Sequence, residues 1–295
     1  MFDRITIVNV DGRIGDLHET QLALHYSATQ MPGARCLLLS PTKPKKLLPL
    51  IEHIPIVPMG HLEYSLFVTY ALHQFIDTEF ALIVQNDGWV LNGASFLPEF
   101  FEYDYLGAPT GLADVLTPDG KKTFVRRFTW VQRMLESRQT PGFKINYSMN
   151  GGFSLRSKKF LQTPSQLGLE YRLRPPTVSR NRVSRYAMQW PSGDAWEDVY
   201  HCVINRDMSD KVGILFPPLS VGLKFAFEHL HPHLHEGMDI SKIFGHHMGA
   251  RRLTSLDPLT IRFTWLEREL LTLGMEDVVF QTFKKLGYKL EFPPG

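Results

Sequence analysis

Apolar runs and helix signals alternate over the first 85 positions of the chain. Short apolar runs rich in aliphatic residues, at 5–10, 34–40 and 79–85, are typical of buried strands. Asp16 followed three residues later by Glu19 resembles a capping box and predicts a helix over about 17–31, and apolar spacing predicts another over 63–76. This order predicts an α/β fold on a mostly parallel sheet with helices on both faces. Ligands of such sheets bind outside the carboxyl ends of the strands.

The later parts of the chain are less regular. Residues 111–145 carry seven lysines or arginines against three acids, and 171–190 carry five arginines and no acid. We interpret both stretches as loop insertions across the sheet, either solvated surfaces or flaps that meet a diphosphate or an acidic acceptor. From 251 to 295, an amphipathic pattern that is clearest after 262 predicts a C-terminal helical extension that packs on the core or forms homodimer contacts.

Composition and charge narrow the class of protein. With 43% hydrophobic and 21% charged residues, the chain is typical of a folded globular protein. Its formal net charge of +2 is too balanced for a protein whose main partner is a nucleic acid. No apolar window reaches the roughly 18 residues of a membrane span, and the first residues lack the pattern of a signal peptide. Cys36 and Cys202 lie far apart, which favours free thiols and a cytoplasmic protein.

The stretch "QNDGWVLN" at 85–92 offers the first candidate chemistry. Asn-Asp-Gly between apolar runs is a strong hairpin signal, yet the apolar run after Asp87 is short. The alternating elements before it instead place Asp87 just past the carboxyl end of a strand. An acid there, with Gly88 beside it, leaves room for a divalent cation and the phosphates that it would hold.

Two further stretches combine backbone freedom with charge. Asn150, Gly151 and Gly152 form a segment that a ligand can approach closely, followed by Arg156; the alternative is a glycine-rich bulge with a surface arginine. Neither a Walker loop nor a dinucleotide fingerprint is present. In "AWEDV", Glu197 and Asp198 follow Trp196, so a general base could meet a sugar ring there, although acids also suit the first turn of a helix.

Histidines gather late in the chain. His229, His231, His233 and His235 alternate, which indicates either a metal site or a solvated loop. "FGHH" at 244–247 is short and flanked by glycine. A histidine of this motif could complete a metal site begun by Asp87.

Taken together, these motifs resemble the GT-A class of nucleotide-sugar-dependent glycosyltransferases. More narrowly, the chain is similar to a bacterial family, largely catalogued as a domain of unknown function, that carries the motifs "QxDG", "EYDYxGAP", "NGGFSLRS", "ED" and "FGxH" in this order. The corresponding stretches are "QNDGWVLN" (85–92), "EFFEYDYLGAP" (99–109), "NGGFSLRS" (150–157), "EDV" (197–199) and "FGHH" (244–247). The similarity spans about residues 3 to 250.

The resemblance implies a GT-A catalytic domain over 1–250, with a nucleotide-sugar half at about 1–110 and an acceptor half at about 146–250. Because Gln85 and Asn86 precede Asp87 where GT-A enzymes carry a DxD motif, only the second acid is present. Asp87 would be a metal ligand together with His247, or with its neighbour His246. Asp198 would be the catalytic base, with Glu197 as second choice. Donor and acceptor would contact the remaining motif residues, which are Gln85, Asn86, Gly88, Asn150, Gly151, Gly152, Arg156 and Trp196.

The implied activity is transfer of a sugar from a nucleoside-diphosphate sugar, with a UDP-sugar favoured, to a hydroxyl of a glycan or glycoconjugate. The expected reaction is inverting and assisted by manganese or magnesium, in bacterial surface-polysaccharide synthesis. Two other hypotheses stay open: a nucleotidyltransferase on a related sheet, and a protein without catalytic activity that binds carbohydrate or metal.

Overall fold

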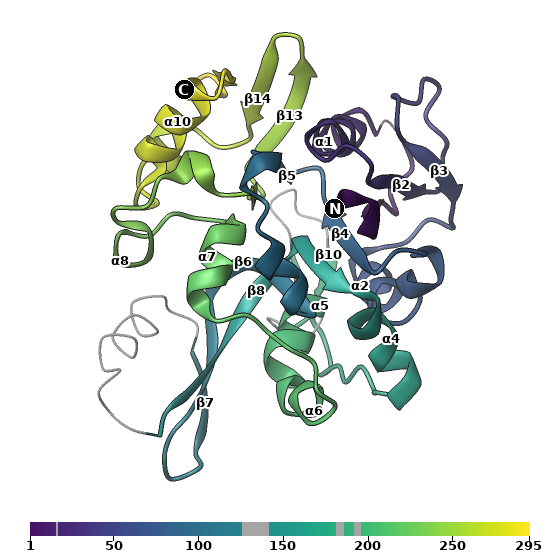
Figure 1. Cartoon of the computed structure of the whole chain (residues 1–295), viewed down its shortest axis with the longest axis vertical. Coiled ribbons are helices and arrows are strands. Elements are labelled where there is room, and N and C mark those ends of the chain that lie inside the picture. The colour runs from purple at the N-terminus through teal and green to yellow at the C-terminus, as the bar shows by residue number, and fades with distance from the viewer. Residues whose placement is uncertain (16, 126–141, 181–185, 192–195) are drawn as a thin grey trace.

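The central sheet is mixed. The computed structural model describes residues 1–295 except 16, 126–141, 181–185 and 192–195 (Figure 1). Seven strands lie in the order β3-β2-β1-β4-β8-β6-β7. Strands β1 (Ile5–Val10), β2 (Arg35–Ser40), β3 (Glu52–Pro55) and β4 (Phe80–Val84) run parallel.

The other half of the sheet is antiparallel. Strand β8 (Lys144–Ser157) pairs antiparallel with β4 and with β6 (Tyr105–Leu116), and β6 pairs antiparallel with β7 (Lys122–Val125). The prediction of an α/β fold is therefore confirmed, whereas the prediction of a mostly parallel sheet holds for one half only. The first basic stretch, expected to be a loop insertion, contributes β7, the end of β6 and the start of β8 in its described part.

Both faces of the sheet are covered because the strand residues point alternately to opposite sides. Ile5, Ile7 and Leu38 belong to one hydrophobic cluster with Leu24 of helix α1 (His18–Gln30). Their neighbours along the strands belong to a second cluster, with Val68 of α2 (His61–Tyr70) and Phe160 of α4 (Lys158–Leu167). The two predicted helices are present. Residue 16 of the predicted capping box lies outside the described residues.

After β4 the chain leaves the main sheet. Strand β5 (Gly88–Val90) pairs with β12 (Gly245–His247), and β12 pairs with β11 (Ala226–Phe227), so these three strands form a separate sheet. Strands β4 and β5 therefore do not form a hairpin. The short sheet brings the "NDG" and "FGHH" stretches side by side, although about 160 residues separate them along the chain.

The C-terminal residues are not purely helical, contrary to the prediction. Strands β13 (Arg251–Leu256), β14 (Leu259–Phe263) and β15 (Lys289–Glu291) form a sheet beside α9 (Glu267–Leu270) and α10 (Glu276–Lys285). Leu253, Ile261 and Phe263 are buried on one face of this sheet, which is the alternation of a half-buried hairpin. Figure 1 shows β13 and β14 beside α1, and α10 on the outside of the molecule.

The remaining segments are short. The second basic stretch contains the hairpin strands β9 (Thr177–Arg180) and β10 (Tyr186–Gln189). It is followed by α5 (Glu197–Val199), a π-helical turn at Tyr200–Ile204, α6 (Arg206–Lys211), α7 (Leu219–Phe225) and α8 (Pro232–His235). Short 3-10 turns lie at Phe2–Arg4, Leu72–Phe75, Gly93–Ser95, Pro98–Glu102 and Ile240–Lys242. Within the described ranges, no helix is long and apolar enough to cross a membrane.

Candidate active site

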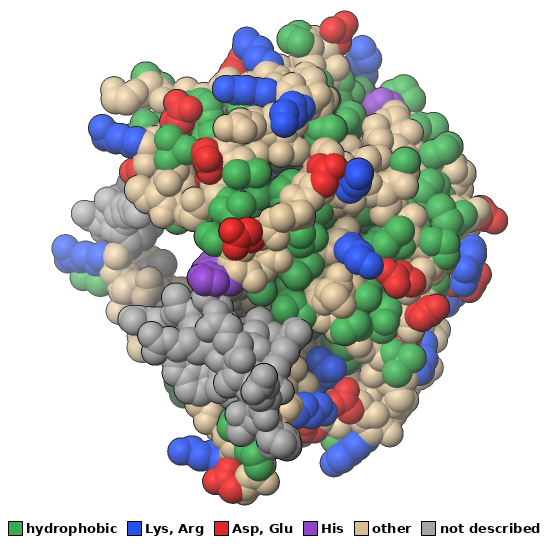
Figure 2. Space-filling view, turned by 60° about the vertical axis from the view of Figure 1, so that its left-hand side comes forward, with side chains coloured by type: hydrophobic (Ala, Val, Ile, Leu, Met, Phe, Trp, Pro, Cys, Tyr) green, Lys and Arg blue, Asp and Glu red, His purple; other side chains and the backbone are tan. Residues whose placement is uncertain are grey.

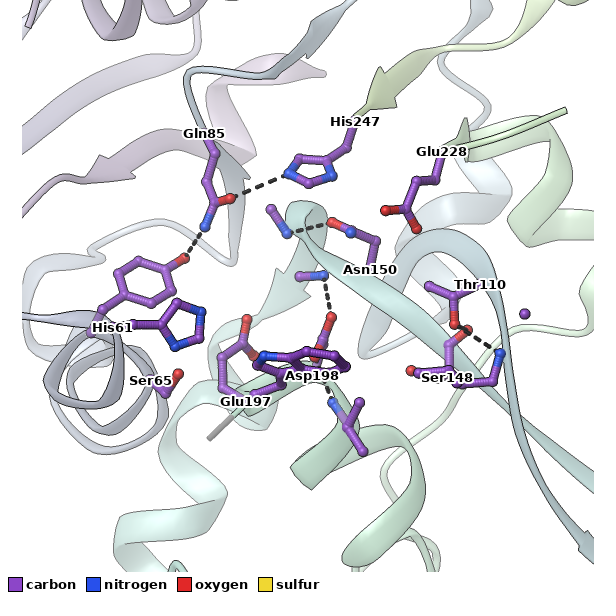
Figure 3. A pocket seen from close by; sticks show the side chains of 17 residues that line it. His61, Ser65, Gln85, Thr110, Ser148, Asn150, Glu197, Asp198, Glu228 and His247 are labelled. Atoms are coloured by element: carbon purple, nitrogen blue, oxygen red, sulfur yellow. Dashed lines mark hydrogen bonds between the residues drawn. The ribbon is translucent and has the colours of Figure 1, made fainter. Parts of the chain in front are cut away.

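A cleft of about 450 Å³ opens at the carboxyl end of β4. From β1 the chain proceeds to β2 and β3 on one side of the sheet and returns to β4 on the other, so β1 and β4 flank a topological switch point. Sheets of this kind bind ligands in the crevice at such a point. The polar side chains that line the cleft come from seven segments: His61, Tyr64, Ser65, Gln85, Thr110, Ser148, Asn150, Glu197, Asp198, Glu228 and His247 (Figure 3).

Asp87 and His247 form a buried acid–histidine pair, of which His247 lines the cleft and Asp87 does not. His247 Nε2 lies 3.0 Å from Asp87 Oδ1, and Arg252 Nη1 lies 3.6 Å from Asp87 Oδ2. Burial opposes the negative charge, but His247 and then Arg252 outweigh it and hold the pKa of Asp87 at about 2. Burial also opposes protonation of His247, yet the carboxylate of Asp87 raises the pKa of that imidazole. Asp87 is therefore ionised at neutral pH, and its negative charge favours the protonated form of His247.

Gln85 links this pair to helix α2. Its Nε2 donates to the hydroxyl of Tyr64 at 2.9 Å, and its Oε1 lies 3.3 Å from His247 Nε2. The backbone N–H of Gln85 donates to the carbonyl of Gly152 at 2.9 Å. Gln85 thus connects His247 to the end of β4 and to Gly152 of strand β8.

His246 is not a metal ligand, because it points the other way. Adjacent residues of a strand face opposite sides, and His247 takes the side toward the cleft. The fully buried His246 lies in the core, with its ring centroid 4.2 Å from that of Trp89 and 5.4 Å from that of Phe283. Burial lowers its pKa well below the ordinary value, so it is neutral.

The acidic pair forms the facing wall at the start of α5. Backbone N–H groups of Val199 and Gly151 donate to Asp198 Oδ1 at 2.7 Å and Oδ2 at 3.2 Å. Burial, followed by the negative charge of Glu197, raises the pKa of Asp198 to about 7. Asp198 is thus oriented by the backbone and able to exchange a proton near neutral pH, as a general base must.

Glu197 is engaged by a different partner. Its Oε1 accepts a hydrogen bond of 2.8 Å from Arg156 Nη2, and both side chains are buried. Arg156 also donates to the hydroxyl of Ser154 and lies over the ring of Tyr105. The expectation that Arg156 lines the donor and acceptor cleft is wrong, because residue 156 points into the core and holds Glu197 from behind.

Gly151 and Gly152 bring the two walls together. A Cβ atom on Gly151 would collide with Glu197 Oε1, and one on Gly152 would collide with His247 Nε2. Both glycines lie within strand β8. Because they have no side chain, the backbone of β8 can pass close to Glu197 and His247. Asn150 accepts a hydrogen bond from the N–H of Gly152 at 2.6 Å and also faces the cleft.

A family profile matches the part of the chain that contains the cleft. The profile of the family described as "Protein of unknown function (DUF5672)" matches residues 60–247, which is more than half of the chain. The chain belongs to the DUF5672 family. No curated protein matches the sequence. The DUF5672 segment begins just before α2 and ends at His247, so it contains every cleft residue named above.

Other predicted residues lie at the margin of the DUF5672 cleft. Trp196 is 43% exposed and lines the cleft, as predicted. Gly88 is buried where β5 meets β12, and its role is close packing against the backbone of His246. Asn86 is only partly buried and does not line the cleft. Gly88 and Asn86 therefore shape the strand end that carries Asp87 and do not face the cleft.

Several cleft residues were not predicted from the sequence. His61 and Tyr64 lie on α2, and Glu228 follows β11. Glu228 directly precedes the histidine-rich stretch, and no motif of the sequence includes it. No three His, Cys, Asp or Glu side chains in the described part of the chain come together as a metal site, and His235 instead pairs with the backbone of His231. Only the pairing of β11 with β12 places Glu228 near His247.

Proposed function

We propose that this DUF5672 protein is a glycosyltransferase that moves a sugar from a nucleoside-diphosphate sugar to an acceptor hydroxyl, on a GT-A type of fold. One observation carries the proposal: His247, paired with the buried Asp87 at a strand end, faces a backbone-oriented carboxylate with a pKa of about 7 across one cleft. The cleft volume is within the range of small-ligand sites. One wall could therefore stabilise the leaving group while the opposite wall accepts the proton of the attacking hydroxyl.

The wall of Asp87 and His247 suits the leaving diphosphate. His247 Nδ1 is buried without a hydrogen-bond partner, and Asp87 Oδ1 is engaged by His247 Nε2, so a cation would have to take the place of that contact. Magnesium-like cations are commonly held by one or two protein ligands together with water and substrate phosphates, and this pair, with Gln85 Oε1 nearby, fits that pattern. A bound manganese or magnesium ion would supply Lewis-acid stabilisation of the developing negative charge. Arg252 adds a fixed positive charge at 3.6 Å from Asp87.

The wall of Asp198 suits the acceptor. A hydroxyl is a poor nucleophile, so a base within hydrogen-bond reach must take its proton during attack. The two backbone N–H groups hold the carboxylate, and Trp196 presents an aromatic surface on which a sugar ring can pack. With the base and the leaving-group side on facing walls, single displacement with inversion is the expected course.

A ligand screen tests the proposal. Thermal unfolding is measured with nucleoside diphosphates, nucleotide sugars and nucleoside triphosphates, each with and without manganese. At about a hundredfold excess over Kd, a ligand of the folded state stabilises it by about 2.7 kcal/mol, which raises the melting temperature by several degrees. The expected result is stabilisation by one family of nucleotide sugars and slow release of the nucleoside diphosphate.

Two outcomes would favour the competing hypotheses. Release of pyrophosphate from a triphosphate would identify a nucleotidyltransferase. Tight zinc binding in calorimetry, with no response to any nucleotide, would favour a binding protein. The variant Asp87→Asn serves as a matched control, because it keeps the shape of the side chain and removes the charge that would hold the cation.

A further inference from the structure

The hairpin of strands β9 and β10 stands apart from the three other sheets. In the part of the chain that the structure describes, β9 and β10 pair only with each other. The antiparallel register sets Arg180 opposite Tyr186 and Val178 opposite Met188. Because side chains alternate along a strand, these four residues share one face, which we call the hairpin face.

The hairpin face is apolar, basic and open. Val178 is 68% exposed, Tyr186 70% and Met188 65%, so the apolar side chains of this face project into solvent. Arg180 lies over the ring of Tyr186 at 5.0 Å, and its Nη2 donates to the hydroxyl of Tyr186 at 3.0 Å. The exposed side chains therefore form one contiguous surface instead of scattered single residues.

The described part of the hairpin stretch is basic. Residues 171–180 and 186–190 carry Arg172, Arg174 and Arg180 and no acid, in a chain whose formal net charge is only +2. Arg172 is also exposed, and it is paired at the surface with Glu170, just outside this stretch. A surface that combines aliphatic and aromatic side chains with arginines matches the boundary between anionic lipid headgroups and acyl chains.

The hairpin is attached next to the cleft at both of its ends. Before β9, the ring of Tyr171 stacks on that of Tyr200, with centroids 4.3 Å apart, and Tyr200 lies two residues after Asp198. After β10, the chain reaches Trp196, which lines the cleft. A surface bound by the hairpin would thus lie near the wall that we assign to the acceptor.

We propose that the hairpin face docks the protein onto an anionic lipid surface. Val178, Tyr186 and Met188 enter the headgroup region, while the arginines contact the phosphates. Docking would give the cleft access to an acceptor held at that surface, and this benefit rests on the proposed function. The docking itself does not depend on it. Vesicle binding therefore tests the docking alone, and nucleotide binding tests the proposed function alone.

Co-sedimentation with vesicles is the direct experiment. The full chain is mixed with vesicles of phosphatidylcholine alone or of phosphatidylcholine with phosphatidylglycerol. Binding to the anionic vesicles is expected, with a decline as salt is raised, because screening shortens the range of surface charges to about 10 Å at 0.1 M. Each arginine removed should weaken binding about fivefold, the equivalent of about 1 kcal/mol.

Two variants separate the apolar and the charged contributions. The apolar variant combines Val178→Ser, Tyr186→Ser and Met188→Ser; the charge variant combines Arg172→Glu and Arg180→Glu. Their matched controls change exposed apolar and basic residues elsewhere: Val57→Ser, Leu215→Ser and Leu271→Ser, and Arg268→Glu with Lys285→Glu. Both hairpin variants should lose at least tenfold in vesicle affinity with an unchanged melting temperature, whereas both controls should bind like the original chain.

Three results would overturn the proposal: no binding of the original chain to anionic vesicles, equal loss in the control variants, or equal binding to neutral vesicles. Hairpin-dependent binding to single-stranded RNA without vesicle binding would also overturn it and assign the hairpin face to nucleic acid. Nucleotide-sugar binding by the hairpin variants is expected to stay unchanged. Its loss would point to a damaged cleft and a different role for the hairpin.

Discussion

At the scale of single residues, Asp198 should be the side chain on which turnover depends most. Its carboxylate faces the cleft and is held by two backbone N–H groups. Replacement by asparagine preserves size and removes the ability to accept a proton. Because general base catalysis contributes about a hundredfold to ten-thousandfold in rate, Asp198→Asn should lower turnover by at least two orders of magnitude. Steady-state kinetics with the donor found in the screen measures this loss.

Donor binding and stability distinguish this effect from misfolding. Asp198→Asn should bind the nucleotide sugar as the original chain does, since the donor contacts lie on the other wall. Asp207→Asn is the matched control, because Asp207 is exposed on α6 and pairs only with Lys122 at the surface in the described ranges. Retained turnover in Asp198→Asn, or equal loss in Asp207→Asn, would contradict the assignment.

The pH dependence of turnover should report the same carboxyl group. Burial and Glu197 raise the pKa of Asp198 to about 7. The base acts only when deprotonated, so kcat/KM should fall about tenfold per pH unit below this pKa and level off above it. A profile that stays flat down to pH of about 5 would show that another group takes the proton.

The same shift predicts the stability of the variant. An acid with a raised pKa binds its proton more tightly in the folded state, so its contribution to stability decreases as pH rises from about 4 to about 7. Asparagine carries no such charge. Asp198→Asn should therefore unfold at a higher temperature than the original chain at pH 8 and at a similar temperature near pH 4. Calorimetric melting at both pH values checks the sign.

The limits of sequence reasoning are clearest for neighbouring residues. The resemblance ranked His247 before His246 and Asp198 before Glu197, but the residue pattern alone did not separate the neighbours. His247 meets Asp87 while His246 packs against Trp89, and Asp198 is held by backbone N–H groups while Glu197 is held by Arg156. The side of β12 that His247 takes depends on the register of β12 with β5, and the different partners of Glu197 and Asp198 depend on where α5 starts. Neither is encoded locally.

At the scale of elements, the buried pair of Arg156 and Glu197 should fasten α5 to strand β8. Both side chains are almost fully removed from water, and Nη2 and Oε1 lie 2.8 Å apart. Arg156→Met would leave a buried carboxylate without its partner, which typically costs about 3–5 kcal/mol of folding free energy. Chemical denaturation measures this cost. The double variant Arg156→Met, Glu197→Leu should recover most of it, because replacing both charges removes the desolvation penalty.

An exposed pair provides the comparison. Arg4 and Glu79 are joined at 2.7 Å with both side chains substantially exposed. Exposed pairs contribute about 0–1 kcal/mol, so Arg4→Met should cost about 1 kcal/mol or less. If Arg156→Met costs no more than Arg4→Met, Arg156 does not hold α5 in place.

Among the elements, the local hydrophobic pattern predicted the parallel half of the central sheet but missed much of its antiparallel half. The strands at 5–10 and 79–85 are continuous apolar runs, as buried parallel strands are, and were found to within a residue or so. Strand β8 spans Lys144–Ser157, whereas Asn150–Gly152 was expected to be a segment open to a ligand, with a glycine-rich bulge as the alternative. Its glycines lower strand propensity, and they are present because Glu197 and His247 leave no room for side chains. Long-range contacts therefore override the local signal there.

At the scale of the whole molecule, the C-terminal extension, residues 251–295, completes the core behind the site. Phe283 and Tyr288 pack around His246 and Trp89, and the indole N–H of Trp89 donates to the hydroxyl of Tyr288 at 3.0 Å. Arg251 and Glu276 form a fully buried pair at 2.8 Å inside the extension. The strand that carries His247 is therefore supported by residues outside the DUF5672 segment.

A chain that ends at Ala250 should consequently fail to fold cooperatively. The truncation removes Val279, Phe280, Phe283 and Tyr288 from the main hydrophobic cluster, and each such side chain contributes about 1.5–3 kcal/mol when buried. Their sum is comparable to the roughly 5–15 kcal/mol by which whole domains are stable. Near-UV circular dichroism and thermal melting of the truncated chain should show no fixed aromatic packing and no sharp transition. A cooperative transition with nucleotide-sugar binding would instead show that residues 1–250 are self-sufficient, and that β12 holds His247 without the support of Phe283 and Tyr288.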